Sequence, residues 1–293
     1  MDIETNYRVD ATFRWLGSSL KTKEELSLTV CGIERCKRDK FYGPAVRDDY
    51  HVHFVLSGKG TLQVEDRTYT IGRGQIFVIY PNVETYYFTD PSDPWQYTWV
   101  SFTGTKAAYF LEKAGITEKQ PIRETFIYPE EFLALTEKLL NHHELTIANE
   151  LIRTATLYEI VALLVDSRNR ELAKKQEPLK PDYSADIYVK HAVEYIHHNY
   201  SNIRVSDIAA YIGITRSYLT HIFTERLHVS PQEYLLTYRL EQGCRLLRTT
   251  NLSIQEISEK IGYSNPLTFS KIFKNTYSMS PKNYRIQIER SDK

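Results

Sequence analysis

The sequence predicts an α+β protein in which a β-rich N-terminal part is followed by helices and by an all-α C-terminal domain with two helix-turn-helix units. Three observations predict it. Short strand-like segments fill the first 105 residues, helical periodicity begins after them, and an internal repeat lies near the C-terminus. With 293 residues, the chain has the length of about two domains of roughly 100–200 residues each.

Residues 1–105 contain apolar segments that Gly-rich or Pro-containing turns separate, which is typical of a sandwich or small barrel. The expected strands are Tyr50–Leu56, Thr61–Glu65, Thr68–Ile71, Gln75–Tyr80 and Trp95–Phe102.

Residues 106–167 change to helical periodicity, with helices expected at 106–114, 129–140 and 147–166. On the last helix one side gathers Leu151, Ala155, Tyr158, Val161, Ala162 and Val165. Residues 168–184 carry many charges and two prolines, so we expect a linker there, before a DNA-binding domain at 185–290.

The C-terminal domain contains a repeat. Ile208–Gly213 matches Ile257–Gly262 at an offset of 49, and the following Phe, Ser-Pro and Tyr positions match at an offset of 50. Each copy predicts a helix, a turn whose glycine has φ > 0, and a second helix. Ser206 and Ser253 are the expected N-caps, and 234–248 should form one connecting helix.

The second helix of each copy predicts a DNA-reading face. In the first copy Leu219, Ile222 and Phe223 should face inward, which leaves polar side chains outward. Two helical hairpins that only pack together remain the alternative.

The C-terminal part of the chain is mildly basic. Residues 185–293 hold 14 basic and 10 acidic side chains, a net charge of +4, and the rest of the chain holds 23 and 27, a net charge of −4. A basic C-terminal part is compatible with contacts to DNA phosphates.

The C-terminal 100 residues resemble the AraC/XylS family of bacterial regulators. The resemblance rests on Arg239-Leu240, on Ser253–Ile257, on Ile261–Lys274 and on Ser280–Arg285. Where the family has glycine, this chain has His228 and Ser278, and where it has alanine in the connecting helix, this chain has Gly243. The DNA-binding candidates within this frame are Arg216, Ser217, Thr220, His221, Asn265, Ser270, Lys271 and Lys274.

The segments 42–60 and 74–102 resemble the cupin-like sensor half of the same family, most closely regulators of the raffinose and multiple-sugar type. Aromatic residues are dense there, and their rings can pack on the C–H faces of a saccharide while Arg and His donate hydrogen bonds. Some of these aromatics could instead belong to the barrel core. The ligand-binding candidates are Arg47, His53, Tyr87, Trp95, Tyr97 and Trp99.

The pair His51-x-His53 suggests a metal-binding cupin, but the other ligand positions hold Ser57, Gly58 and Thr85 or Tyr86. We therefore expect no metal, no cofactor and no catalytic residues. The alternative is a cupin-type sugar-modifying enzyme with an accessory helical domain, and a third reading is a regulator controlled by a protein partner alone.

The resemblance implies a transcription regulator, an activator, with double-stranded DNA, a small saccharide, a second copy of the chain and RNA polymerase as partners. The helices at 131–140 and 147–166 are the expected dimer contacts, and the alternative is that both pack on their own barrel. The sequence shows no signal peptide or membrane span, and Cys31, Cys36 and Cys244 lack CxxC spacing, which predicts a cytoplasmic protein.

Overall fold

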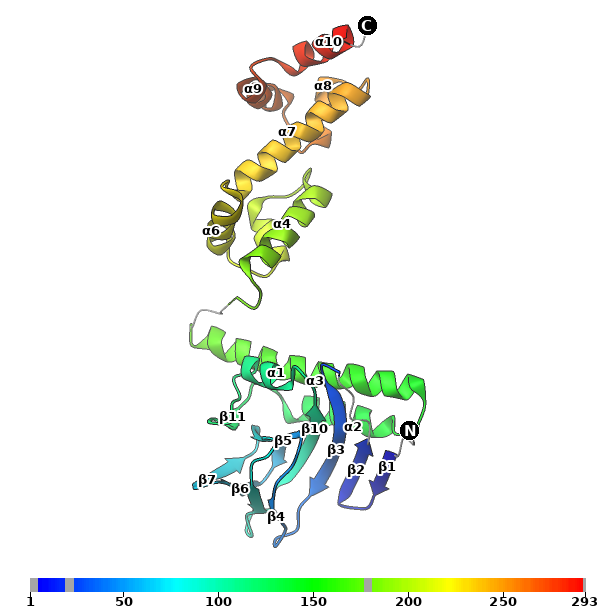
Figure 1. Cartoon of the computed structure of the whole chain (residues 1–293), viewed down its shortest axis with the longest axis vertical. Coiled ribbons are helices and arrows are strands. Elements are labelled where there is room, and N and C mark those ends of the chain that lie inside the picture. The colour runs from blue at the N-terminus through cyan, green and yellow to red at the C-terminus, as the bar shows by residue number, and fades with distance from the viewer. Residues whose placement is uncertain (1–4, 19–23, 177–180, 292–293) are drawn as a thin grey trace. The chain divides into compact units, whose positions relative to one another are not determined.

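The computed structural model describes residues 5–18, 24–176 and 181–291, which belong to two compact units, Met1–Leu179 and Lys180–Lys293. The first unit contains β1–β11 and α1–α3, and the second contains α4–α10 (Figure 1). The α+β class predicted from the sequence is confirmed.

Two antiparallel sheets form the β-rich part of the first unit, with strand orders β1-β2-β3-β10-β5-β8-β11 and β4-β9-β6-β7. The strands are β1 (Thr5–Val9), β2 (Phe13–Ser18), β3 (Ser27–Arg35), β4 (Phe41–Ala45), β5 (Tyr50–Ser57), β6 (Lys59–Val64), β7 (Arg67–Gly72), β8 (Gln75–Ile79), β9 (Thr85–Thr89), β10 (Gln96–Thr103) and β11 (Ile122–Glu124).

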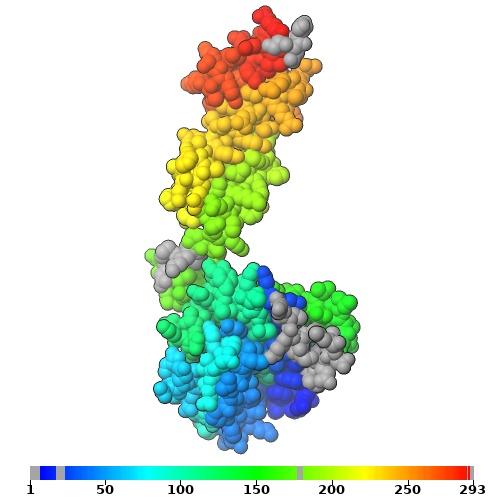
Figure 2. All heavy atoms as spheres, viewed as in Figure 1, coloured from blue at the N-terminus to red at the C-terminus, as the bar shows by residue number. Residues whose placement is uncertain are grey.

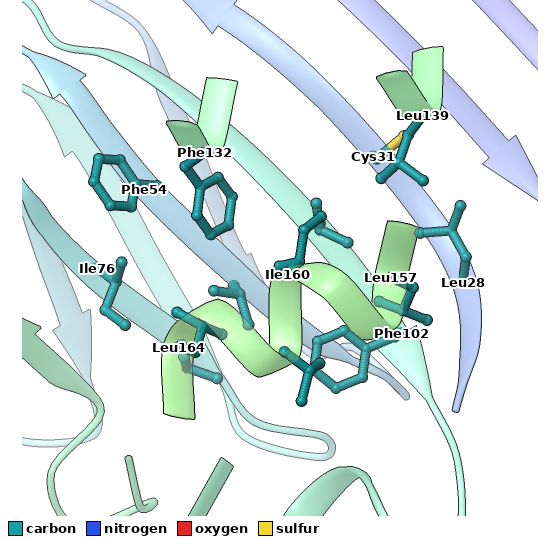
Figure 3. Close-up of a cluster of buried hydrophobic side chains, with 14 of the residues drawn as sticks. Leu28, Cys31, Phe54, Ile76, Phe102, Phe132, Leu139, Leu157, Ile160 and Leu164 are labelled. Carbon is teal, nitrogen blue, oxygen red and sulfur yellow. The ribbon is translucent and has the colours of Figure 1, made fainter. Parts of the chain in front are cut away.

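The larger sheet separates two apolar cores because successive side chains of a strand point to opposite faces. One face is covered by α1 (Ala107–Lys113), α2 (Pro129–Asn141) and α3 (Ile147–Lys174). Figure 3 shows this core, in which the rings of Phe54 and Phe132 lie 5.0 Å apart. The opposite face of β5 and β10 points toward the smaller sheet and forms the second core.

Two features of this unit differ from the sequence-based expectation. The strand β11 lies within the segment expected to be helical and pairs with β8, and three residues are too few to produce a periodic signal. The helix α3 continues eight residues past 166, into the segment expected to be a linker. Ion pairs within the helix, Arg170 with Asp166 and Arg168 with Glu171, support this extension. Residues 177–180 of that expected linker lie outside the described residues.

The side of α3 predicted from its apolar spacing is mostly the outward side. Leu151, Ala155, Tyr158 and Ala162 are exposed, whereas Leu157, Ile160 and Leu164 pack on the sheet. The stripe that faces the barrel lies on the opposite side of the helix, and it includes Arg153 and Thr156, two buried polar residues that an apolar pattern does not register.

The second unit is built around one long helix, α7, and Figure 2 shows its atoms (yellow to orange) against those of α8–α10 (orange to red). Leu235 joins the core of the first repeat, while Leu240 and Leu247 join the core of the second. The helices are α4 (Ala185–Asn199), α5 (Val205–Tyr211), α6 (Arg216–Leu227), α7 (Pro231–Thr249), α8 (Ile254–Lys260), α9 (Pro266–Tyr277) and α10 (Pro281–Ser291).

Helix ends in the two repeats follow the same backbone geometry. Gly213 and Gly262 end the first helices at φ of +72° and +90°, as expected. Ser253 caps α8, and its side chain accepts a hydrogen bond from the Glu256 N–H, as expected. The expected cap Ser206 instead lies inside α5, because this helix begins at Val205 and Arg204 is its N-cap.

His228 and Ser278, the two departures from the family pattern, both end recognition-type helices in the left-handed region, at φ of +59°. A non-glycine residue in that conformation costs roughly 1–2 kcal/mol. Each of the two residues therefore makes a left-handed turn that glycine would make without this cost in stability.

Arg239 of α7 joins the two repeats. Its guanidinium donates to the carbonyl oxygens of Tyr200 (2.7 Å) and Ile203 (3.0 Å) in the first repeat. The same group lies 5.8 Å from the ring centroid of Tyr263 in the second repeat. Gly262 also lies against the Ser201 carbonyl, which an added Cβ would approach to 2.2 Å. The orientation of the two helix-turn-helix units is therefore fixed by contacts as well as by α7.

Candidate functional site

The helix α6 presents a polar outward face. Thr215 caps it by accepting from the Tyr218 N–H, while Leu219, Ile222 and Phe223 are buried as predicted. The candidate side chains of the first repeat are all exposed: Arg216, Ser217, Thr220 and His221. The hydroxyl of Thr220 donates to the Arg216 carbonyl at 3.0 Å, which leaves its oxygen available as an acceptor.

The helix α9 is less polar on its outward face. Lys271 and Lys274 are exposed and Ser270 is half-buried, while Leu267 is 76% exposed beside them. Asn265 caps the helix, because its Oδ1 accepts from the Leu267 N–H at 2.8 Å. The side-chain NH2 group of Asn265 is therefore left for another partner, while its oxygen caps the helix.

Within the first unit, five of the six ligand candidates lie in the core between the two sheets. His53 and Trp99 are register partners on β5 and β10, so the barrel strands bring them together directly. The exposed fractions of the five are small: Trp95 0%, His53 2%, Tyr97 3%, Tyr87 5% and Trp99 8%. Arg47, the sixth, is half-buried.

Ring contacts organise this aromatic cluster around His53. The His53 ring stacks on Phe77 at 4.3 Å and meets the edges of Tyr87 and Tyr97 at 5.4 Å each. Trp95 stacks on Phe77 and lies directly over Gly60, where a Cβ would come within 2.4 Å of its ring. With no exposed surface, Trp95 is positioned as a core residue of the barrel.

Arg47 lies at the more exposed edge of the aromatic cluster. Its Nη1 donates to the Tyr42 hydroxyl at 3.1 Å, and its guanidinium carbon lies 4.1 Å from the centroid of the Tyr42 ring. The Tyr42 ring in turn stacks on Tyr87 at 5.4 Å. Tyr42 was not among the sequence-based candidates, although it lies within the segment that carries the resemblance.

Three buried polar atoms in the aromatic cluster have no partner among the described residues: His53 Nδ1, Arg47 Nε and Trp95 Nε1. Leaving such an atom unsatisfied costs about 1–3 kcal/mol. By contrast, Tyr97 is satisfied, because its hydroxyl donates to Glu34 at 2.8 Å, and Glu34 also pairs with Lys40 at 2.9 Å. The unpaired atoms therefore keep unused hydrogen-bonding capacity inside the barrel.

His51 belongs to a separate buried network that the sequence did not reveal. One ring nitrogen, Nε2, lies 2.6 Å from Asp49 Oδ1, and the other, Nδ1, lies 2.5 Å from Ser101 Oγ. Thr29 donates to the second oxygen of Asp49. The signal for it is the register of β5 and β10, which pairs His51 with Ser101.

Burial lowers the pKa of His51, and it lowers the pKa of His53 well below its ordinary value, which favours the neutral form of both rings. Because both nitrogens of His51 are engaged, the pair His51-x-His53 does not offer two free metal ligands. Among the described residues no group of three or more His, Cys, Asp or Glu side chains is placed to hold a metal ion.

A barrel core with unsatisfied polar atoms, joined in one chain to two helix-turn-helix units, defines a ligand-sensing, DNA-binding transcription regulator. Residues 27–161 match the model of the AraC-like ligand binding domain, and residues 208–287 match that of a helix-turn-helix domain. The chain belongs to the AraC family of transcription regulators.

Three curated relatives align over most of both chains. The Msm operon regulatory protein of Streptococcus mutans is 34% identical, over 90% of this chain and 94% of its own length. The lactose operon transcription activator of Staphylococcus xylosus is 30% identical, over 89% and 92%. The raffinose operon transcriptional regulatory protein of Pediococcus pentosaceus is 30% identical, over 90% and 95%. All three are named as regulators, and none as an enzyme.

Within the described part of the chain, no helix is both long enough and apolar enough to cross a membrane.

Proposed function

We propose that this chain activates transcription of sugar-utilisation genes in the cytoplasm, together with RNA polymerase, when a saccharide binds between the two sheets of its barrel. The observation that supports it most strongly is the aromatic cluster, whose unpaired polar atoms include His53 Nδ1 and Arg47 Nε. The relatives named for lactose and raffinose operons support a saccharide as the ligand class. The experiment that tests it measures operator affinity of the full chain with and without a panel of saccharides.

In the proposed complex Tyr87 and Trp99 supply faces for the C–H surfaces of the sugar, and His53 and Arg47 hydrogen-bond to its hydroxyls. Tyr97 shapes the site through its ring, because its hydroxyl is held by Glu34. Since Tyr42 and Arg47 are the more exposed members, we place the entrance at their edge of the aromatic cluster.

For DNA, we propose that α6 and α9 enter successive major grooves on one face of the duplex. The helix α7 has 19 residues, so it is about 28 Å long at 1.5 Å per residue, comparable with the roughly 34 Å of one DNA turn. The polar face of α6 offers base-edge contacts through Ser217, Thr220 and His221. The lysines of α9 suit phosphates better, so sequence reading should come mainly from the first repeat.

The double variant Thr220→Ala/His221→Ala is expected to reduce the preference for operator over random DNA by at least about 30-fold, since each of the two lost base contacts is worth about 1–3 kcal/mol. Lys274→Ala is the comparison: it should weaken binding to both DNAs alike and lower the salt dependence. Competition binding at two salt concentrations measures both effects. An equal loss on operator and random DNA in the double variant would show that α6 contacts phosphates only.

We propose that the outward stripe of α3 joins two copies of the chain. Ile147 is 78% exposed, Leu151 65% and Tyr158 38%, and all three lie on the side away from the barrel. Such a run of apolar side chains on one helix face is typical of a helix that packs against a symmetric partner.

Leu151→Glu is expected to weaken dimerisation at least tenfold, because two charges would be buried near a symmetry axis. Val46→Glu, which replaces another exposed apolar residue of the same unit (59% exposed), should leave it unchanged. Sedimentation equilibrium of both variants measures the dimer constant. A Leu151→Glu protein that dimerises as tightly as the Val46→Glu control would exclude this face.

A further inference from the structure

A cleft of about 880 Å³ lies at the C-terminal end of α3, between that helix, β7 and the segment 119–126. None of the six ligand candidates of the barrel lines it. Five basic side chains line the cleft, against two acidic ones, Glu124 and Glu171. Its lining therefore carries a net charge of +3, although the first 184 residues carry −4 in total.

One carboxylate serves three of the cations. Glu171 pairs with Arg123, with Arg168 at 2.8 Å and with Lys175 at 2.7 Å. The side chains of Arg123, Arg168 and Glu171 are only 16–25% exposed, so the charges are partly desolvated. Because one negative charge cannot balance three positive ones, this ion cluster retains an excess of two positive charges, which matches a phosphate dianion.

The ion cluster is also held in place. Arg123 Nη1 donates to the Gly115 carbonyl at 2.7 Å, and Arg67 donates to the carbonyl of Lys119 at 3.0 Å, which fixes the loop that carries Lys119. Arginines whose forks are oriented in advance suit the planar, two-point recognition of phosphate oxygens.

The rest of the cleft supplies further cations and two apolar walls. Lys119 and Lys174 are exposed, and Lys174 lies 5.4 Å from the ring of Phe126, which is itself 39% exposed. Tyr69 lines the cleft with Phe126. The alternative is a purely structural ion pair between β11 and α3, which would need only Arg123 and Glu171. A structural role of this kind does not explain why Lys119, Lys174, Tyr69 and Phe126 also line the cleft.

We propose that this cleft binds a phosphate-bearing small molecule, as an effector site separate from the barrel interior. Arg123 and Arg168 hold the phosphate, Lys119 and Lys174 add charge at the entrance, and Tyr69 and Phe126 contact the remainder of the ligand. Binding here does not depend on a saccharide in the barrel.

The test is a titration of the full chain with inorganic phosphate, with a hexose phosphate and with the same hexose unphosphorylated, at constant ionic strength in chloride. Thermal shift and calorimetry give the affinities. We expect the phosphate-bearing compounds to bind and the free hexose not to bind at this site. A hexose phosphate that binds more tightly than phosphate identifies the esterified ligand, and equal affinities identify the free ion.

The variant Lys119→Gln/Lys174→Gln should weaken phosphate binding at least tenfold, and it leaves the Arg123–Glu171 ion cluster intact, so the fold is retained. Arg170→Gln is the matched control, because Arg170 is on the same helix, pairs with Asp166 and does not line the cleft. The phosphate affinity of this control should equal that of the unmodified chain. Both variants keep the DNA-binding unit unchanged, so anions bound there contribute equally to the two measurements. No phosphate binding beyond the chloride baseline, or the same affinity in both variants, would overturn the proposal.

Discussion

Replacing Gly262 with alanine should destabilise the DNA-binding unit by about 2–5 kcal/mol and abolish tight operator binding. Two effects combine at this position. Its φ of +90° is unfavourable for any residue with a Cβ, and that Cβ would lie 2.2 Å from the Ser201 carbonyl oxygen. The Ser201 loop cannot move away easily, because Arg239 is bonded to the carbonyls of Tyr200 and Ile203 on either side of it.

The equivalent position of the first repeat provides the control. Gly213 has a φ of +72°, but an added Cβ there meets nothing within 4 Å. Gly213→Ala should therefore show the backbone effect alone, about 1–2 kcal/mol. Denaturant unfolding of the full chain, followed by helical circular dichroism, and operator titration compare the two variants. Equal losses would show that the contact between the repeats contributes nothing.

His53→Leu is expected to remove the saccharide response while leaving the unliganded protein as stable as before, or slightly more stable. The substitution replaces a ring with an unpaired buried Nδ1 by an apolar side chain, so no hydrogen bond to the protein is lost at that atom. A loss of ligand binding without a loss of stability is the signature of a residue retained for function.

His51→Leu, two residues earlier on the same strand face, is the matched comparison. It would leave Asp49 and Ser101 without their partner in a buried network, at a cost of about 1–3 kcal/mol or more, since one of them is a carboxylate. Thermal unfolding of the two variants separates these roles. If His53→Leu destabilises as much as His51→Leu does, His53 is a structural residue.

The sequence predicted those features that depend on local pattern. Alternation on β10 placed Tyr97 and Trp99 on one face, the repeat located α6 and α9, and the inward stripe of Leu219, Ile222 and Phe223 is buried. Glycine positions gave both positive-φ turns. Each of these signals lies within one strand, one helix or one turn.

What the sequence did not predict depends on register or on long-range contact. The Asp49–His51–Ser101 network exists because β5 and β10 pair in one particular register. The contact of Arg239 with the loop of the first repeat joins residues 39 positions apart in the sequence, and no local pattern predicts it. The apolar spacing of α3 predicted a stripe of apolar side chains, but spacing alone cannot determine which side of a helix packs on the barrel.

The central claim is that a saccharide binds between the sheets against His53 and Arg47. The most direct test is a thermal-shift and calorimetric titration of the full chain with mono-, di- and trisaccharides, alongside the His53→Leu variant. The account predicts that at least one saccharide stabilises the unmodified chain and that the variant loses this stabilisation. No stabilisation by any saccharide, or equal stabilisation of the variant, would contradict it.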